Sequence, residues 1–395
     1  MHWLPTGGLS KWRCSSIHWR KLIGDATAMC SSIPRFDDLS AGAKYNSSAV
    51  TCCAMNGAIA IIQTAFLGDA ALAMLFAQQV RNTFPNAPVL FVGRPDARAL
   101  AEANPSITRT IVFDKRGRDR GPGGIMRRAA ELRSAGVKTV FCLQRSIRTA
   151  LLAIASGARV RIGFSTATGA RLFTHRVPYA TELHEIERNA KLLAALGVEP
   201  PAPQLPLELR LRDDQHERVR TAIERTGKQP RIAIAPGAVW ATKRWLPERF
   251  GEVARMLHRD GASVAFLGGA SDRELCTAIA RQSGGYVLAG ELDPAETVAF
   301  LRSCTLLIAN DSAPTHLATL AACPTITIFG STVPAFGFGP RAPGSVTVEP
   351  PPLECRPCGT HGRRQCPLGT LECMHSIEAA DVLRHARTLL LQARL

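Results

Sequence analysis

The segment from Asn310 to Pro340 combines residue types that could bind a phosphate or a pyrophosphate. An apolar run before it predicts a strand, after which Asp311, Ser312 and Pro314 begin a predicted helix. Asp and Ser are good N-cap residues, and proline suits the first helical turn because its missing N–H has no intrahelical partner there. A helix that begins at the carboxyl end of a strand, here with His316 on its first turns, presents free N–H groups and a positive dipole end. Taken alone, the pattern is equally consistent with an ordinary strand–loop–helix in an α/β core.

A second candidate lies in the loop after the first predicted strand, residues 63–72, which carries Gly68 and Asp69. As an N-cap, Asp69 would stabilise the following helix by about 1 kcal/mol. As a general base, it would face a cleft and take a proton from an attacking hydroxyl. The residue types leave both interpretations open and slightly favour the cap.

Two glycine-containing loops follow predicted strands in the second half of the chain. In residues 235–250, Gly237 bends the chain, and Lys243 lies before a tryptophan and a helix start, a position suited to a leaving phosphate. A solvated Lys-Arg pair beside a packing tryptophan is equally consistent. In residues 266–275, Gly268 and Gly269 would let a ligand approach the backbone, and Asp272 or Glu274 could accept hydrogen bonds from a ribose or base. Taken alone, this segment favours a plain strand-to-helix turn.

These loops are spaced by alternating apolar strands and amphipathic helices, which predict parallel sheets with helices on both faces. The rhythm breaks at the proline-rich segment Val198 to Leu209, which predicts an extended linker, and then restarts. The predicted fold is therefore α/β, with two Rossmann-like doubly wound domains facing a cleft. The predicted organisation is a poorly defined extension or start-site artefact (1–54), a first domain (55–205), a second domain (206–376) and a terminal helix (377–395) that packs back toward the first domain.

Composition narrows the class of partner. The net charge is +16 and the pI is about 9.8, which indicates an anionic partner. Nucleic acid is not predicted, because aromatic residues are sparse and no nucleic-acid-binding motif occurs. No GxGxxG or Walker A loop follows any predicted strand, which argues against nicotinamide dehydrogenases and P-loop NTPases. The apolar run from Gly57 to Val80 is interpreted as a strand, a turn and a helix, because polar residues interrupt its middle. With no signal peptide recognised and the cysteines dispersed, the expected compartment is the cytosol.

The three loops and the phosphate-binding segment together resemble the heptosyltransferase family, glycosyltransferase family nine, whose members transfer heptose from ADP-heptose to the lipopolysaccharide inner core. The resemblance covers the chain from about Met55 onward, and its strongest motif is NDSAPTHLATLAACPTITIFGST. It implies the glycosyltransferase-B fold, inversion at the anomeric carbon, no metal or other cofactor, and a nucleoside-diphosphate sugar donor. Where this chain has Ala313-Pro314, relatives more usually have Gly-Leu or Gly-Met, and the proline removes one N–H that could bind phosphate.

The resemblance also implies roles for individual residues. Asp69 would be the catalytic base and Lys243 would bind the departing diphosphate. The donor-binding set that it implies is Asp311, Ser312, Ala313, His316, Gly237, Thr242, Gly268, Gly269 and Glu274.

A basic stretch on the amino-terminal side is predicted to grip the acceptor, since an inner-core precursor bears carboxylates and phosphates. A solvated surface loop is the plain alternative. The predicted acceptor-binding residues are Lys115, Arg116, Arg118, Arg120, Arg127 and Arg128. The same positive charge would hold the enzyme peripherally at the anionic inner face of the plasma membrane.

Four cysteines near the carboxyl terminus could chelate zinc, because four thiolates suffice for a closed structural site. They are Cys355, Cys358, Cys366 and Cys373. Their spacing is not that of a standard zinc ribbon, so reduced cysteines that pack a loop against the core are favoured and no metal is predicted. Two alternative functions stay open: another nucleotide-sugar glycosyltransferase or epimerase on this fold, or a non-catalytic nucleotide-sugar-binding protein.

Overall fold

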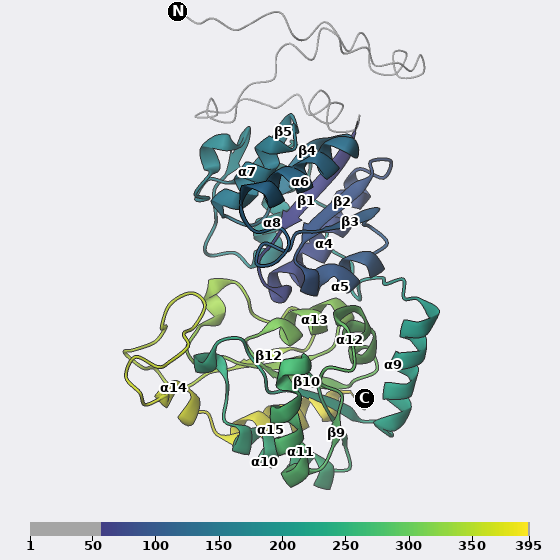
Figure 1. Ribbon diagram of the computed structural model, residues 1–395. Helices are drawn as coiled ribbons and strands as arrows, with labels where there is room; N and C mark the ends of the chain where they lie inside the picture. The colour runs from purple at the N-terminus through teal and green to yellow at the C-terminus, as the bar shows by residue number, and fades with distance from the viewer. Residues whose placement is uncertain (1–56, 394–395) are drawn as a thin grey trace, which may run out of the picture.

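The computed structural model describes residues 57–393, which form two α/β domains, one above the other in Figure 1. The predictions for residues 1–54 lie outside this range. The first domain is built on a six-stranded parallel sheet with the order β3-β2-β1-β4-β5-β6. Its strands are β1 (Ala58–Gln63), β2 (Val89–Gly93), β3 (Arg109–Val112), β4 (Val137–Cys142), β5 (Val160–Phe164) and β6 (His175–Val177). Its helices are α4 (Leu67–Thr83), α5 (Arg98–Ala103), α6 (Gly121–Ser134), α7 (Ile147–Ala155) and α8 (Glu185–Ala194).

The second domain repeats this topology with the order β12-β11-β10-β7-β8-β9, again all parallel. Its strands are β7 (Arg231–Ala235), β8 (Ser263–Phe266), β9 (Tyr286–Val287), β10 (Leu306–Asn310), β11 (Thr325–Ile328) and β12 (Val346–Val348). Its helices are α9 (Asp213–Arg225), α10 (Pro247–Arg259), α11 (Arg273–Ser283), α12 (Pro294–Leu301), α13 (Ala313–Ala321), α14 (Glu372–His375) and α15 (Ala379–Gln392). The predicted doubly wound α/β fold is confirmed for both halves.

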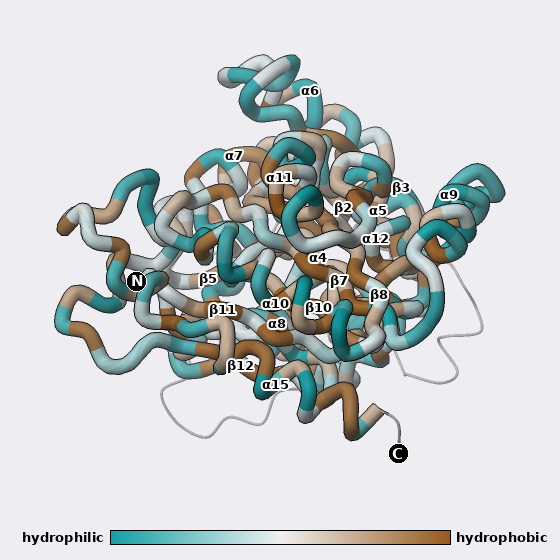
Figure 2. The backbone as a smooth tube through the Cα atoms, turned by 90° about the horizontal axis from the view of Figure 1, so that it is seen from below, coloured by the Kyte–Doolittle hydropathy of each residue, from teal (hydrophilic) through white to brown (hydrophobic). Residues whose placement is uncertain are grey.

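Alternate residues of β1 enter different cores, as the period of a strand requires. Ile59 and Ile61 lie in the cluster beneath α4 and α8, whereas Ala60 and Ile62 lie in the cluster beneath α6 and α7. The first cluster continues into the second domain, because α4 packs against α13 across the interface. In Figure 2 the interior around α4 is brown, while α6 and α9 on the outside are largely teal.

The proline-rich linker is coil, as predicted, but both domains hold it. The Gln79 Nε2 donates to the carbonyl of Pro201 at 2.7 Å, and the N–H of Gln204 donates to the Gln78 Oε1 at 2.7 Å. Further on, the N–H of Leu207 donates to a carbonyl at the end of α13 at 2.8 Å. The linker is therefore fixed to α4 and α13.

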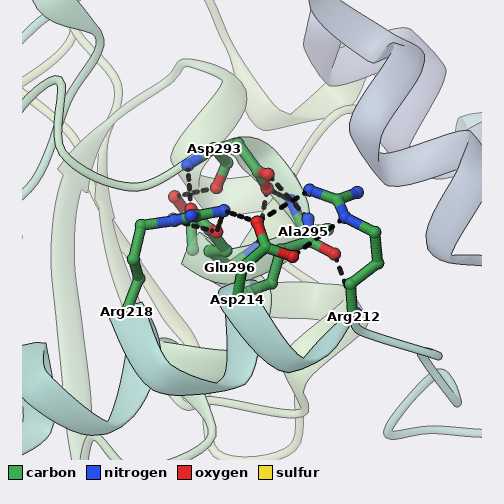
Figure 3. A network of polar contacts seen from close by, with 8 residues as sticks. Arg212, Asp214, Arg218, Asp293, Ala295 and Glu296 are labelled. Atoms are coloured by element: carbon green, nitrogen blue, oxygen red, sulfur yellow. Dashed lines mark hydrogen bonds and ion pairs between the residues drawn. The ribbon is translucent and has the colours of Figure 1, made fainter.

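A polar network joins α9, the first helix after the linker, to the start of α12 (Figure 3). Asp293 caps α12 by accepting the N–H groups of Ala295 and Glu296 at 2.8 and 2.9 Å. Arg218 on α9 donates to the Glu296 Oε1 at 2.7 Å. Because the first turn of α12 also borders the interdomain cavity, this network fixes one wall of the site.

The terminal helix does not pack toward the first domain, so that prediction is wrong. The apolar face of α15, which includes Val382 and Ala386, is buried with Ile326 and Ile328 of β11 in the core of the second domain. α15 also packs beside α10. The apolar side chains of α15 recur at helical spacing and form one stripe along the helix. The sheet of the second domain buries this stripe, so α15 covers its own domain.

The apolar run from Gly57 to Val80 is β1 followed by most of α4, as predicted. Among the described residues, no helix combines the length and apolarity that crossing a membrane needs.

Candidate active site

A cavity of about 630 Å³ lies between the two domains, with walls from both. The first domain contributes the loop after β1 and the start of α4, including Gly68 and Asp69, and a loop after β2. The second domain contributes the turns after β7, β8 and β10 and a loop near the carboxyl terminus. The cavity therefore lies at the carboxyl ends of both sheets, where open α/β folds bind ligands.

Asp69 is the third residue of α4, and the N-cap position belongs to Phe66, which makes no side-chain capping bond. The prediction of Asp69 as an N-cap is therefore wrong, because the helix already begins at Leu67 and not after Asp69. Burial raises the pKa of Asp69 above its usual value, while the positive charges of His361 and Lys243 and nearby N–H groups of the first turn oppose that rise. A carboxylate of raised pKa that lines a cavity is suited to accept a proton.

Gly68 lets the two walls approach each other. A Cβ at this position would lie 2.8 Å from the Cδ2 of His316, on the far wall. His316 is buried, which lowers its pKa to about 4, so its imidazole is neutral at neutral pH. Its Nδ1 is buried and finds no hydrogen-bond partner among the described residues.

Lys243 and Asp311 form an ion pair on the second wall. The Lys243 Nζ lies 2.5 Å from the Asp311 Oδ2, and the same oxygen accepts the Thr332 hydroxyl at 2.6 Å. Both charged side chains are largely buried, at 14% and 7% exposure. An ammonium carries three N–H donors and this bond uses one, so donors remain for an anion in the cavity.

The start of α13 is held by its neighbours on the sheet. Ser312 occupies the N-cap position, but its hydroxyl lies 3.3 Å from the carbonyls of Gly237 and Asn310 and does not cap the helix. Pro314 lies in the first turn, as predicted. Asn310 donates to the carbonyl of Pro236 at 2.8 Å and accepts the N–H of Trp245 at 3.0 Å, so the loop after β7 is tied to the end of β10.

The glycine loops surround an internal carboxylate. A Cβ on Gly237 would lie 2.4 Å from the Asp272 Oδ1, and one on Gly268 would lie 2.7 Å from the Asp272 Cβ. The N–H of Gly269 donates to the Asp272 Oδ2 at 2.9 Å. The space that these glycines leave is thus filled by Asp272, which lines the cavity, whereas Glu274 is exposed and outside the lining. The structure therefore does not support Glu274 as a donor contact.

Thr242 is also not part of the lining. Its hydroxyl donates to the carbonyl of Arg363 at 3.1 Å and accepts the N–H of that residue at 2.8 Å. This contact fixes the cysteine loop, residues 355–373, over the site, so that Thr360 and His361 border the cavity. Thr242 therefore acts on the cavity through this loop.

The four cysteines of the cysteine loop are free thiols of different exposure. Cys355 is exposed, Cys358 and Cys366 are partly exposed, and Cys373 is buried in the second core. Within the described part of the chain, no group of three or more His, Cys, Asp or Glu side chains is arranged to hold a metal ion.

The predicted acceptor grip separates into two sets. Arg116 lines the cavity, and Lys115 lines a smaller hollow of about 160 Å³ beside it. Arg127 and Arg128 instead form ion pairs with the buried Asp119 at 2.7 and 3.0 Å, so they stabilise the loop before α6. These contacts do not support Arg127 and Arg128 as acceptor contacts, because the buried Asp119 already binds both side chains.

The other two members of the predicted grip, Arg118 and Arg120, are exposed and lie outside both linings. Burial and the positive charges of Arg94, Arg148 and Arg116 lower the pKa of Lys115. Its Nζ donates to the carbonyl of Thr64 at 2.5 Å, next to the end of β1. On the first wall, the cations that border the cavity or the smaller hollow beside it are therefore Lys115, Arg116 and Arg94.

Several residues that line or hold the site were not predicted. They are Arg94, Asp96, Thr332, His361 and Phe338. The position of Arg94 directly after β2 could have identified it, because the end of a strand next to β1 reaches the same edge. His361 had no such signal, since its place depends on the long-range contact with Thr242.

The start of α8 joins the first domain to a loop of the second. The His184 Nε2 lies 3.0 Å from the Gly339 carbonyl, and Arg188 donates to the Phe336 carbonyl at 2.9 Å. The N–H of Glu185 donates to the Gly337 carbonyl at 2.9 Å. Burial and then the charge of Asp69 raise the pKa of Glu185 to about 7. These contacts hold the loop around residue 337, which borders the cavity, against the first domain.

Comparisons with known proteins identify a matching family and several relatives. The model of glycosyltransferase family 9 (heptosyltransferase) matches residues 125–368. The chain is 24% identical, over 69% of its length and 78% of the relative, to the lipopolysaccharide core heptosyltransferase OpsX of Haemophilus influenzae. Among solved structures, a family 9 glycosyl transferase from Veillonella parvula superposes with a TM-score of 0.76 at 24% identity, covering 85% of this chain and 98% of that one.

A second solved structure, the ADP-heptose lipopolysaccharide heptosyltransferase II of Escherichia coli, has a TM-score of 0.71 at 21% identity, covering 86% of this chain and all of that one. At these identities, the superpositions identify the fold, which is the expected glycosyltransferase-B architecture. The family match extends over most of the chain and includes Lys243, Asp311 and His316 of the second wall. The chain therefore belongs to glycosyltransferase family 9, and the protein is a glycosyltransferase.

Proposed function

We propose that the protein transfers heptose from ADP-heptose to a lipopolysaccharide inner-core acceptor, with inversion at the anomeric carbon and without a metal ion. One observation carries this proposal: the two walls that face each other across the cavity carry different chemical groups. Asp69, with its raised pKa, lies on the first wall, and the Lys243–Asp311 pair lies on the second. The similarity to OpsX and to the ADP-heptose enzyme of Escherichia coli supports the choice of acceptor and donor.

In this proposal the Asp69 carboxylate takes the proton of the acceptor hydroxyl as its oxygen attacks the anomeric carbon. The new carbon–oxygen bond forms on the face opposite the bond to the diphosphate. That second bond breaks, and ADP leaves with its electron pair. A single displacement of this kind inverts the anomeric centre.

The departing diphosphate gains negative charge, and the second wall is suited to stabilise it. Lys243 has donors to spare beyond its bond to Asp311, and the start of α13 supplies the positive end of a helix dipole. His316 contributes a buried polar atom without a partner. We therefore expect transfer to proceed without a divalent cation.

Acceptor binding is assigned to Arg94, Lys115 and Arg116, which border the cavity on the first wall. An inner-core precursor carries carboxylates and phosphates, and guanidinium groups bind such anions in pairs of hydrogen bonds. The precursor is anchored in a membrane, so the proposal places the enzyme peripherally at the inner face of the plasma membrane.

The test is transfer to a purified core acceptor from a panel of nucleotide sugars, with EDTA in every reaction. We expect transfer from ADP-heptose and an inverted linkage in the product by NMR. Loss of all transfer in EDTA, with recovery on adding Mg²⁺, would contradict the metal-free mechanism. Transfer from a different sugar nucleotide in preference to ADP-heptose would contradict the donor assignment.

A further inference from the structure

Helix α7 exposes three large aliphatic side chains along one side. Ile147, Leu151 and Ile154 are 45%, 40% and 44% exposed. Spacings of four and three residues bring them into one stripe on a helix, which we name the α7 ridge. The opposite side of α7 is already buried against the sheet through Ala150 and Ala153. The ridge is therefore a second apolar face that the fold does not use.

Other large hydrophobic side chains exposed among residues 57–393 occur singly on their elements. They are Phe66, Met126, Val239, Tyr286, Leu368 and Leu391. Single exposed apolar side chains are ordinary on protein surfaces, whereas a contiguous group indicates a binding surface. Met126 lies on α6, the helix that packs beside α7, so the same layer carries a fourth exposed apolar side chain.

The segment of the chain that contains the ridge is basic and has no acidic residue. Between Leu132 and Thr181 the chain carries eight Lys or Arg residues and no Asp or Glu. Arg133 donates to the carbonyl of Ala155, at the carboxyl end of α7. Arg148 lies on α7 itself, and Arg171 lies on a short 3₁₀ helix that packs against α7. An apolar stripe flanked by cations is complementary to a surface with anionic head groups above an apolar interior.

The ridge lies on the outer side of the first domain, and one of its ends is near the cavity. The core beneath α6 and α7 consists of first-domain residues, so α7 faces away from the second domain (Figure 1). The ridge begins at the first residue of α7, after the short segment 143–146 that follows β4, at the edge of the sheet that borders the cavity. The positive charge of Arg148 contributes to lowering the pKa of Lys115. The Ile147 end of the ridge therefore lies at the sheet edge that borders the acceptor side of the cavity.

We propose that the α7 ridge docks the enzyme on an anionic phospholipid bilayer, with Ile147, Leu151 and Ile154 at the boundary of head groups and acyl chains. The surrounding arginines pair with lipid phosphates. In this orientation the acceptor side of the cavity lies next to the bilayer, where the sugar head group of a membrane-anchored lipid can enter it. This inference rests on the proposed function, because that function supplies the membrane-anchored acceptor.

The experiment is vesicle flotation of the full chain with phosphatidylethanolamine–phosphatidylglycerol vesicles and, separately, with phosphatidylcholine vesicles. The ridge variant is Ile147→Gln/Leu151→Gln/Ile154→Gln, and the matched control is Tyr286→Gln/Leu391→Gln, which removes exposed apolar side chains elsewhere. Glutamine is a good helix former and the ridge side chains are half exposed, so the variant is expected to fold. We expect the wild type and the control to bind the anionic vesicles. The ridge variant should bind them at least about tenfold more weakly than the wild type does.

Removal of a flanking charge separates the electrostatic part. Arg171→Gln should weaken binding to the anionic vesicles about fivefold and leave binding to phosphatidylcholine unchanged. Ridge-variant flotation equal to that of the wild type would overturn the proposal. A second outcome would also overturn it: the wild type does not bind vesicles but forms dimers, and the ridge variant is monomeric. The ridge would then bind a second copy of the chain.

A water-soluble acceptor without its acyl chains distinguishes this inference from the proposed function. The ridge variant should transfer heptose to it at the wild-type rate, but should be slower with acceptor embedded in vesicles. If the wild type transfers to neither acceptor, the proposed function fails, while flotation still decides whether the ridge binds lipid. Equal rates of variant and wild type on the embedded acceptor would count against the ridge.

Discussion

The two sheets share one strand order, yet the segments after their first strands differ. After β1 only residues 64–66 precede α4, and Asp69 lies in the first turn of that helix. After β7 residues 236–246 precede α10, and Lys243 lies within this long segment. The carboxylate is thus positioned by local backbone geometry, whereas the ammonium is positioned by contacts with distant residues.

This difference separates the expected effects of mutations. A change at Asp69 should alter the chemical step and leave the second wall intact. A change at Lys243 should alter donor binding and stability together, because its ion pair with Asp311 helps to hold the site.

The largest expected effect is that of Asp69→Asn on turnover. Without a general base, turnover should fall by about two to four orders of magnitude, because proton transfer in the transition state is lost. The affinity for ADP should stay close to that of the wild type in calorimetry. Asp96→Asn, which changes another carboxylate of the same wall, is the control and should retain most activity. Unchanged turnover in Asp69→Asn would remove this residue from the mechanism.

The second effect concerns the opposite wall. Lys243→Met leaves Asp311 buried without its cation and should destabilise the fold by about 3 kcal/mol in urea unfolding. Affinity for ADP should fall about tenfold or more. The double variant Lys243→Met/Asp311→Asn should recover most of the stability but not the affinity. Recovery of both would show that Lys243 has no part in donor binding.

A third variant tests whether the two walls must touch. Gly68→Ala would place a methyl group 2.8 Å from the His316 ring, which is buried and cannot move aside easily. We expect the walls to separate and turnover to fall about tenfold, since a misplacement near 1 Å is costly. Gly251→Ala in α10 is the matched control, because its Cβ would lie 3.7 Å from Ile279. The control should retain activity and gain roughly 0.5–1 kcal/mol of stability.

The smallest effect concerns acid stability. Burial lowers the pKa of His184 to about 3, with the charge of Arg341 as a further cause. The unfolded state, with an ordinary pKa of about 6.5, therefore binds more protons than the folded state between these values. Stability is full above about pH 6.5 and is lost as the pH falls, by roughly 2 kcal/mol at pH 5.

His184→Gln should reduce this loss, and urea midpoints at pH 7 and pH 5 would measure it. His316, whose pKa is about 4, shifts stability in the same direction and provides the remaining pH dependence. An unchanged difference between the two midpoints in His184→Gln would show that His184 is not responsible.

Much of the fold follows from periodicity. The sequence pattern predicts strands over Ala58–Gln63 and Arg231–Ala235 and a helix over Pro247–Arg259. These are the observed bounds of β1, β7 and α10. α7 was missed, since apolar residues occupy both its buried and its exposed sides and hide the helical period. The direction in which α15 packs was wrong because periodicity identifies an apolar stripe but not the groove that receives it.

The site was partly predictable for a similar reason. Asp69, Lys243, Asp311 and His316 follow strand ends, and the topology brings strand ends together. His361 depends on a contact between residues 121 positions apart, which no local pattern encodes. Arg127 and Arg128 carried the expected charge, but their pairing with Asp119 was not visible in composition.

The contact between Thr242 and Arg363 has a consequence for the order in which the enzyme is made. Every strand of both sheets precedes residue 349, so all of these strands leave the ribosome before the cysteine loop does. The cysteine loop, with His361, emerges afterwards and completes the cavity. A nascent or truncated chain that stops before Arg363 would therefore contain Asp69 and Lys243 but lack one side of its site.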